Sequence, residues 1–225
     1  MIQWDGVETV LLDMDGTLLD LHFDNQFWLD FLPRRYAERL GCPEPEARHR
    51  LLARMEALRG TLDWYCLDQW SEALDLPLAE LKRELTHLIR YRPGAEGFLQ
   101  ALGRAGLRRV LVTNAHREVL QLKLERTTLG EHLEAAFSAH DFGHSKEDPA
   151  FWEALLAVEP YRREATVLLD DNADVLASAR RAGIAQVMGV ARPDTTRPPR
   201  QAPGFAVVDA FEDVMPPANP GRAAP

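Results

Sequence analysis

The sequence predicts an α/β protein in which a parallel β-sheet carries helices on both faces and accepts an all-helical insertion. An apolar run at Val10–Leu12 stops at two acids, Asp13 and Asp15, as expected for a strand that is buried on both faces. From Gly94 onward strand-like and helix-like patterns alternate, which is typical of a parallel sheet covered by helices. Between these two regions, residues 21–91 show helical spacing alone.

The first strand belongs to the stretch Thr9–Asp20, which reads T-V-L-L-D-M-D-G-T-L-L-D. Strand alternation points Asp13 and Asp15 the same way, beyond the carboxyl end of the strand, where open α/β sheets bind ligands. Gly16 permits the sharp turn that follows. Two carboxylates this close repel each other, so we expect a cation or a shared proton to relieve them. Taken alone, Asp-x-Asp is better explained as an acidic turn in which Asp15 caps the next element.

The insertion is predicted to consist of helices separated by proline and glycine. Asp24 or Asn25 is expected to cap the first helix, which Pro33 interrupts. Pro43 and Pro45 open a second helix, whose apolar stripe is Leu51, Leu52, Met55 and Leu58 and which ends at Gly60. A third helix is predicted over Trp64–Leu74, before Pro77, and a fourth from Leu78 to Ile89. Arg92-Pro93-Gly94 closes the insertion, so we expect one domain at residues 21–91 and another at residues 1–20 and 92–225.

The rest of the chain repeats a strand followed by a helix. Strands are predicted over Arg109–Val112, Ala136–Ser138, Thr166–Leu169 and Ala185–Val190, and a last apolar piece lies at Phe205–Val208. Helices are predicted over Ala95–Ala105, Glu118–Thr127 and Asp174–Ala182, and another follows Asp148-Pro149, which reads as an N-cap and a first helical residue.

The composition limits the classes of partner. A formal net charge of −9 disfavours binding to nucleic acid or acidic membranes but allows a small anionic substrate at a local site. The two cysteines, Cys42 and Cys66, lack metal-ligand spacing, so we expect reduced structural thiols. Residues 1–6 carry no secretory signal, and no apolar window is long enough to cross a bilayer. We therefore expect a soluble cytoplasmic protein without nucleic-acid or membrane partners, and the oligomeric state stays open.

More polar side chains fall at the ends of later strands, where the first acid pair would need them. Thr113 and Asn114 end one strand, Asp170 and Asp171 end another, and Lys146 lies in the loop before a helix. Each has a simpler explanation alone, as a helix cap or a solvated charge. Together they suit phosphoryl transfer. The carboxylates would hold Mg²⁺, and the hydroxyl and the ammonium would bind the phosphate oxygens.

Four segments, D-M-D-G-T-L, V-T-N, S-K-E-D-P and L-L-D-D, resemble the motifs of the haloacid dehalogenase (HAD) superfamily of phosphohydrolases. The resemblance implies a Rossmann-like core, and the insertion is similar to the mobile helical cap of the subclass I members. More narrowly, T-V-L-L-D-M-D-G-T-L-L-D-L, D-W-Y-C-L-D-Q-W-S-E and V-T-N-A-H resemble the bacterial GMP/IMP nucleotidases of that superfamily. It implies a Mg²⁺-dependent hydrolase of purine nucleoside 5′-monophosphates.

The resemblance also implies roles for single residues. Asp13 would be the nucleophile that forms an aspartyl-phosphate, and Asp15 would be the general acid and then the general base. Thr113 and Asn114 would bind phosphate, and Lys146 would neutralise charge around the nucleophile. Mg²⁺ would be bound by Asp13, the Asp15 carbonyl and the last acid pair, with Asp171 expected before Asp170 as the direct ligand. The expected substrate contacts are Gly16, Thr17, Asn114, His116, Trp64 and Tyr65.

Two departures from the superfamily pattern stand out. Glu147 follows the lysine where many relatives have proline, and Asp170 precedes the last acid where many have glycine. The lysine is retained, so little of the expected chemistry changes. The second departure leaves open which of the two acids binds the metal directly.

Other functions remain open at this stage. A phosphatase for phosphoglycolate or a sugar phosphate, or a phosphomutase, shares the same core residues, whereas a dehalogenase needs neither Asp15 nor the later acid pair. A receiver-like phospho-acceptor domain would lack a large insertion, and a binding protein would not need the full catalytic set. The aromatic residues of the insertion favour a purine, although we expect at least half of Trp28, Trp64, Tyr65 and Trp70 to be core packing. His116 is equally a substrate contact or a first-turn residue.

Overall fold

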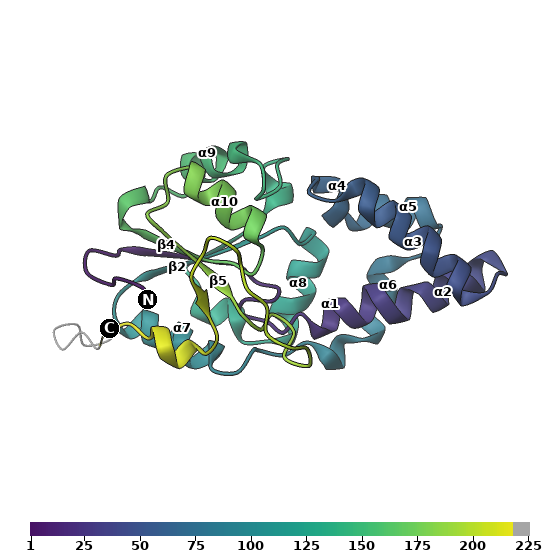
Figure 1. The fold of residues 1–225 in the computed structure, drawn as a ribbon, viewed down its shortest axis with the longest axis horizontal. Coiled ribbons are helices and arrows are strands. Elements are labelled where there is room, and N and C mark those ends of the chain that lie inside the picture. The colour runs from purple at the N-terminus through teal and green to yellow at the C-terminus, as the bar shows by residue number, and fades with distance from the viewer. Residues whose placement is uncertain (218–225) are drawn as a thin grey trace.

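The computed structural model describes residues 1–217 and contains a parallel sheet of six strands in the order β3-β2-β1-β4-β5-β6 (Figure 1). The predicted α/β fold class with a parallel sheet is confirmed. The strands are β1 (Thr9–Leu12), β2 (Arg108–Thr113), β3 (Ala135–Ser138), β4 (Thr166–Leu169), β5 (Gln186–Val190) and β6 (Val207–Val208). Each agrees with a predicted strand or apolar piece to within a few residues.

Helices cover both faces of the sheet, and each face has its own apolar cluster. On one face Phe98 and Leu102 of α7 (Ala95–Arg104) and Leu120 of α8 (Arg117–Arg126) pack on Val10 and Leu12. On the other face α9 (Pro149–Val158) and α10 (Ala173–Arg181) pack on Leu11, Val110 and Val112. Neighbouring strand residues thus belong to opposite clusters, as strand alternation requires.

The strand register aligns the carboxyl ends of the central strands. Leu12 pairs with Leu111 of β2 on one side and with Leu169 of β4 on the other. Asp13 continues the ladder, because its N–H donates to the Leu169 carbonyl at 3.0 Å. The residues that follow β1, β2 and β4 therefore emerge at the same edge of the sheet.

The turn after β1 depends on glycine. Gly16 has a φ of +89°, which side chains rarely allow, and a Cβ there would lie 2.8 Å from both the Asp171 carboxylate and Pro193. The turn is closed by the Gly16 N–H, which donates to the Leu19 carbonyl at 2.8 Å. Any side chain at Gly16 would push the β1 turn away from the acids that follow β4.

The insertion begins with one continuous helical run made of α1 (His22–Gln26), the π-helical turn η1 (Phe27–Phe31) and α2 (Leu32–Leu40). The prediction that Pro33 interrupts this helix was wrong. Proline lacks the N–H that would bond the Leu29 carbonyl, and that carbonyl accepts from the Arg48 guanidinium instead. In the widened turn the Leu32 N–H bonds back to Phe27.

The remaining helices of the insertion differ from the sequence prediction at three places. They are α3 (Glu44–Leu58), α4 (Leu62–Tyr65), α5 (Leu67–Leu74), α6 (Leu78–Glu84) and the 3₁₀ turn η2 (Thr86–Leu88). The helix predicted from Leu78 to Ile89 is divided into α6 and η2, because the backbone of Leu85 leaves helical geometry. The predicted helix Trp64–Leu74 is broken at Cys66, whose extended backbone ends α4 and begins α5. Leu52, predicted on the buried stripe of α3, is 49% exposed because its helix packs through Leu51 and Met55.

The insertion joins the sheet through two chain segments that lie side by side. Leu19 and Tyr91 form an antiparallel bridge, and the Asp20 N–H donates to the Arg90 carbonyl at 2.9 Å. The buried Asp20 carboxylate also accepts from the Arg90 guanidinium at 2.9 Å and from the Thr195 hydroxyl. In Figure 1 the helices α1 to α6 extend away from the sheet beyond this connection.

Among residues 1–217, the structure contains no helix that is both long and apolar enough to span a membrane.

Candidate active site

A cavity of about 600 Å³ lies between the carboxyl edge of the sheet and the insertion. Most of the residues predicted from the sequence meet there. The sheet side contributes Asp13, Asp15, Thr113, Asn114, His116, Lys146, Asp170 and Asp171, and the insertion contributes Trp28, Trp64 and Tyr65. The segments that supply these side chains end or follow β1, β2 and β4, or belong to η1, α4 and the loop before α9.

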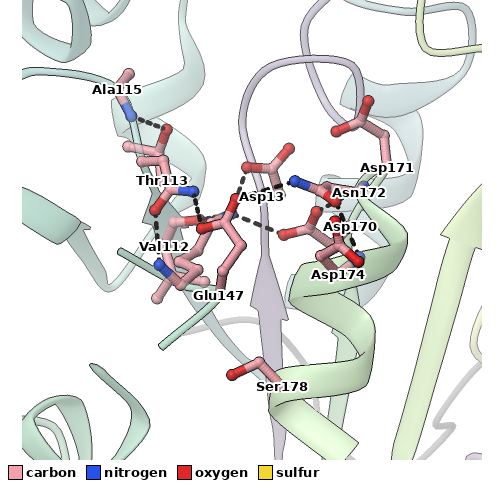
Figure 2. A network of polar contacts seen from close by, with 12 residues as sticks. Asp13, Val112, Thr113, Ala115, Glu147, Asp170, Asp171, Asn172, Asp174 and Ser178 are labelled. Carbon is pink, nitrogen blue, oxygen red and sulfur yellow. Dashed lines mark hydrogen bonds and ion pairs between the residues drawn. The ribbon is translucent and has the colours of Figure 1, made fainter. Parts of the chain in front are cut away.

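Lys146 ties two of the acids together at the floor of the cavity. Its Nζ lies 2.6 Å from Asp13 Oδ1, 2.7 Å from Asp170 Oδ2 and 3.0 Å from the Val112 carbonyl oxygen. Figure 2 labels these three partners, Asp13, Asp170 and Val112. The lysine is 2% exposed, so all three donors of its ammonium are used inside the protein. Burial alone would lower the pKa of Lys146, but the negative charges of Asp13 and Asp170 hold it above its usual value.

Asp13 has one oxygen fixed and one free. Oδ1 accepts from Lys146, whereas Oδ2 is buried and has no hydrogen-bond partner among the described residues. Burial, together with the negative charges of Asp170 and Asp15, raises the pKa of Asp13 to about 7, although Lys146 opposes the shift. A buried carboxylate oxygen without a donor is rare in folded proteins and points to a ligand that is bound in use.

Asp170 and Asp171 complete an acidic group with Asp13. Each of the three offers a carboxylate oxygen within 4.8 Å of the others, and burial raises the pKa of Asp170 to about 6 and that of Asp171 to about 7. The repulsion among three clustered carboxylates is relieved by a cation or by a proton, and hard oxygen donors are the ligands that Mg²⁺ prefers. The donor set and the free Asp13 oxygen therefore fit Mg²⁺.

The two neighbouring acids differ in their other contacts. Asp170 Oδ1 accepts from the Asn172 N–H at 2.9 Å, which leaves its carboxylate bonded on both sides. Asp171 contacts the guanidinium of Arg200, which is half exposed at the mouth of the cavity. Both acids can reach an ion beside Asp13, and Asp171 makes fewer contacts to buried groups.

Asp15 is held by a different lysine. The Lys123 Nζ on α8 lies 2.5 Å from Asp15 Oδ1 and 2.6 Å from Asp24 Oδ2. Asp24 in turn accepts from Lys82 Nζ of α6 at 2.9 Å, so four charges, of which the two lysines are buried, alternate in sign from the sheet into the insertion. Lys82 also lies 4.4 Å from the ring centre of Phe27, within cation–π range.

This chain of charges corrects the prediction for Asp24. Neither Asp24 nor Asn25 caps a helix: α1 begins after Leu21, and the Asn25 amide donates to Asp194 at 2.7 Å. The two lysine partners hold the pKa of Asp24 down at about 2, although burial alone would raise it. Burial raises the pKa of Asp15 despite the attraction of Lys123.

Glu147 links the two sides of the cavity. Its carboxylate accepts from the Tyr65 hydroxyl at 2.7 Å, the Asn114 amide at 2.9 Å and the Asn172 amide at 3.0 Å. Asn114 also receives the Lys146 N–H on its Oδ1 at 2.8 Å, so it orients the loop that carries the lysine. The residue that departs from the superfamily pattern therefore has a structural use, as a contact between the insertion and the sheet.

The other predicted contacts lie as follows. The Thr113 oxygen accepts from the Ala115 N–H at 3.0 Å, so its own hydrogen can donate to a ligand in the cavity. His116 precedes α8 and lines the cavity, but its side chain does not cap the helix. Gly16 and Thr17 lie outside the cavity lining, and Thr17 is fully buried, with its carbonyl accepting from Arg92.

The aromatic residues of the insertion divide between core and cavity. Trp70 is 1% exposed and packs edge-on against Trp28 and Trp64, with ring centres at 5.3 and 6.3 Å. Trp28 and Trp64 are only partly buried, and they and Tyr65 reach the cavity. These three rings can therefore contact a ligand while two of them also support the core of the insertion.

Sequence reasoning missed Lys82, Lys123 and the pairing of Glu147. One signal was available for Lys123, which falls three residues after Leu120 and four after Val119, both of which lie on the buried stripe of its helix. A lysine on such a stripe requires a buried acid. No sequence pattern indicated that the acid comes from two segments far away in the chain.

Comparison with known proteins agrees with this geometry. Residues 7–183 match the model of a family described as haloacid dehalogenase-like hydrolase. A GMP/IMP nucleotidase, YrfG, of Escherichia coli strain K12 is 41% identical over 194 residues, which are 86% of this chain and 87% of that protein. A phosphorylated carbohydrates phosphatase of Thermotoga maritima is 26% identical over 198 residues, 82% of this chain and 85% of that one.

Solved structures share the fold. A HAD phosphatase from Thermococcus onnurineus superimposes with a TM-score of 0.79 over 92% of this chain and 96% of its own, at 20% sequence identity. At that identity the likeness concerns the arrangement of the sheet and helices.

Proposed function

The chain belongs to the haloacid dehalogenase-like hydrolases, and we propose that it is a Mg²⁺-dependent phosphatase of purine nucleoside 5′-monophosphates. The observation that carries the proposal is the state of Asp13, which has one oxygen fixed by Lys146 and the other unpartnered at the cavity floor. A carboxylate held in this way presents a lone pair in a defined direction, as nucleophilic catalysis requires.

In the first step Asp13 Oδ2 attacks phosphorus, and the bond from phosphorus to the leaving 5′-oxygen breaks. Asp15 gives its proton to that oxygen, and burial supports this role because it raises the pKa of the acid. In the second step the Asp15 carboxylate takes a proton from a water molecule, which attacks phosphorus and releases Asp13. Phosphate leaves, and both acids return to their starting states.

The other residues bind and neutralise the phosphoryl group. Thr113 donates to a phosphate oxygen, and Lys146 offsets the negative charge that gathers at Asp13. Mg²⁺ would be held by Asp13, Asp170 and Asp171 with the Asp15 carbonyl, and would screen the carboxylates from the incoming phosphate. Asn114 positions the lysine through its backbone N–H.

The purine part of the proposal rests on the wall that the insertion supplies. Trp28, Trp64 and Tyr65 present aromatic surface to a cavity of about 600 Å³, which suits a flat base more than a small polar sugar. The relative named as a GMP/IMP nucleotidase has the higher identity of the two curated relatives described above, and it is matched over nearly its whole length. We therefore place IMP and GMP ahead of other monophosphates.

We assign residues 21–91 as a cap that closes the cavity. The support is that the two chain connections of this segment lie side by side at Leu19 and Tyr91, and that Tyr65 reaches Glu147 at the floor of the cavity. A cap of this kind excludes water while the phosphoryl group is transferred.

We assign the protein to the cytoplasm. Its two cysteines are free and its composition is acidic, both of which fit a reducing compartment and a small-molecule substrate.

The test is a screen of phosphate release with purified protein, with Mg²⁺ or with chelator. IMP and GMP should give kcat/KM values at least about tenfold above those of phosphoglycolate and glucose 6-phosphate, which have no base, because base stacking contributes about 1–3 kcal/mol. They should also exceed CMP, whose single ring offers less surface to stack than a purine does. Nucleoside di- and triphosphates should react poorly. Asp13→Asn protein, checked for folding by circular dichroism, is the control for a contaminating phosphatase.

The outcomes separate the parts of the proposal. A sugar phosphate or phosphoglycolate as best substrate would contradict the purine assignment and leave the phosphatase chemistry. Full activity in chelator would contradict the role of Mg²⁺, and activity retained by Asp13→Asn would contradict the nucleophile.

A further inference from the structure

A second group of metal-ligating side chains lies where the insertion meets the sheet. Cys66 at the α4–α5 break, His116 just before α8 and His140 in the 3₁₀ turn η4 (Ala139–Asp141) each offer a ligand atom within 4.8 Å of the other two. The histidine rings meet edge-on with centres 5.0 Å apart. This set shares no residue with the acidic group of Asp13, Asp170 and Asp171.

Both histidines present a nitrogen that has nothing to bind. Nδ1 of His116 and Nε2 of His140 are buried and have no hydrogen-bond partner among the described residues. The other nitrogen of His116 faces the Asp68 carboxylate at 3.6 Å. Buried polar atoms are normally bonded, so two orphaned imidazole nitrogens beside a thiol call for a ligand.

We propose that Cys66, His116 and His140 bind one Zn²⁺-class transition-metal ion. One thiolate and two imidazoles are the donors that such ions select, whereas Mg²⁺ avoids sulfur and nitrogen. A carboxylate that faces the outer nitrogen of a ligating histidine is a recurring arrangement at these sites, and Asp68 occupies that position. The thiol proton passes to solvent as the metal–sulfur bond forms, and water fills the fourth position.

The geometry needs a small contraction. Ligand atoms at the usual zinc distances of about 2.0–2.3 Å in a tetrahedron lie roughly 3.3–3.6 Å apart. The three donors lie within 4.8 Å of one another, so a movement on the order of 1 Å closes the site. That movement draws the α4–α5 break toward the sheet.

The site therefore ties the insertion to the sheet. Cys66 directly follows Tyr65, which reaches across the cavity to Glu147 at 2.7 Å. A metal ion bound to Cys66 and to two residues of the sheet side fixes this wall of the cavity in its closed position. The proposal that the ion binds depends only on these donor atoms. Any effect of the bound ion on the rate of turnover depends also on the proposed function of residues 21–91 as a cap.

The test is Co²⁺ binding to the full-length, metal-stripped protein in excess Mg²⁺ and a non-thiol reductant. Co²⁺ reports a thiolate ligand by near-ultraviolet charge-transfer absorption and tetrahedral geometry by visible bands. We expect one equivalent to bind, and Zn²⁺ to displace it. Cys66→Ser should remove the charge-transfer band, and His140→Gln should weaken binding at least about tenfold, since even outer-shell changes cost that much.

Cys42→Ser is the matched control, because Cys42 is the other cysteine of the chain and belongs to neither group of possible metal ligands among the described residues. It should bind Co²⁺ like the unaltered protein. Absence of the band in the unaltered protein, or its loss in Cys42→Ser and survival in Cys66→Ser, would overturn the site. His140→Gln, which leaves the thiol in place, gives an independent result if Cys66→Ser folds poorly.

Hydrogen exchange tests the link between the insertion and the sheet. Zn²⁺ should slow amide exchange over Leu62–Leu74 in the unaltered protein and in Cys42→Ser but not in Cys66→Ser. Equal exchange with and without Zn²⁺ in a protein that binds the ion would contradict the link.

Discussion

Lys123→Met removes the cation that joins Asp15 to Asp24. The Lys123 ammonium is 2.5 Å from Asp15 and 2.6 Å from Asp24, and the lysine side chain is 2% exposed. Asp24 keeps Lys82, whereas Asp15 loses its only ion-pair partner among the described residues. Leaving one buried charge unpaired costs about 3–5 kcal/mol. Because Asp15 is 19% exposed and can take up a proton, we expect the lower end, about 3 kcal/mol.

Urea unfolding measures this loss, and a double-mutant cycle assigns it. Asp15→Asn removes the acid that would be left unpaired, so Lys123→Met should cost at least about 1 kcal/mol less in that background. Lys82→Met is the matched control, since it deletes a second buried lysine that contacts Asp24 at 2.9 Å without touching Asp15. A loss under about 1 kcal/mol for Lys123→Met would refute the importance of the pair.

The same variant has a kinetic signature. The Lys123 cation lowers the pKa of Asp15, so its removal raises that pKa, and the basic limb of the pH profile of kcat moves to higher pH. Lys82→Met should move that limb less, because Lys82 lowers the pKa of Asp15 less than Lys123 does. An unmoved limb in Lys123→Met would mean that Asp15 is not the acid.

Three further outcomes are expected. Tyr65→Ala should lower kcat/KM for IMP about tenfold more than for an aryl phosphate, because a lost stacking contact is worth about 1–3 kcal/mol, and equal falls would count against base contact. In single turnovers, Asp15→Asn should slow phosphoryl transfer from nucleotides more than from aryl phosphates, whose leaving groups need no proton. Burial raises the pKa of Asp13 and of Asp171 from 3.8 to about 7, so the stability that these acids contribute in their protonated form is present at low pH and is lost as pH rises through about 7. Mg²⁺ should therefore raise Tm more at about pH 8 than at about pH 5. Asp171→Asn should remove most of that difference.

The part of the site that the sequence could predict is the part that lies at strand ends. Parallel strands finish at one edge, so Asp13, Thr113 and Asp170 had to lie close together once their strands were recognised. Lys146 followed from a motif, and the structure places it between two of these acids. Their catalytic roles stay predictions until they are tested.

The parts that escaped prediction depend on how helices are rotated and where they bend. Lys82 and Lys123 meet Asp24 only because α6, α8 and α1 turn particular faces to one another, and helical spacing does not supply that orientation. Pro33 was expected to interrupt a helix that continues, since a π-helical turn and the distant Arg48 replace the missing bond. The residues Cys66, His116 and His140 show no ligand spacing in the sequence and come together only through tertiary contacts.

Trapping of the phosphorylated enzyme tests the nucleophile most directly. IMP with a radioactive phosphate would be mixed with the Mg²⁺-loaded protein, quenched in acid within milliseconds, and the protein digested and mapped. We predict a transient label on the peptide that contains Asp13, which hydroxylamine removes and which Asp13→Asn lacks. Phosphate release at the normal rate with no label on that peptide at any quench time, or a label on another residue, would contradict the mechanism.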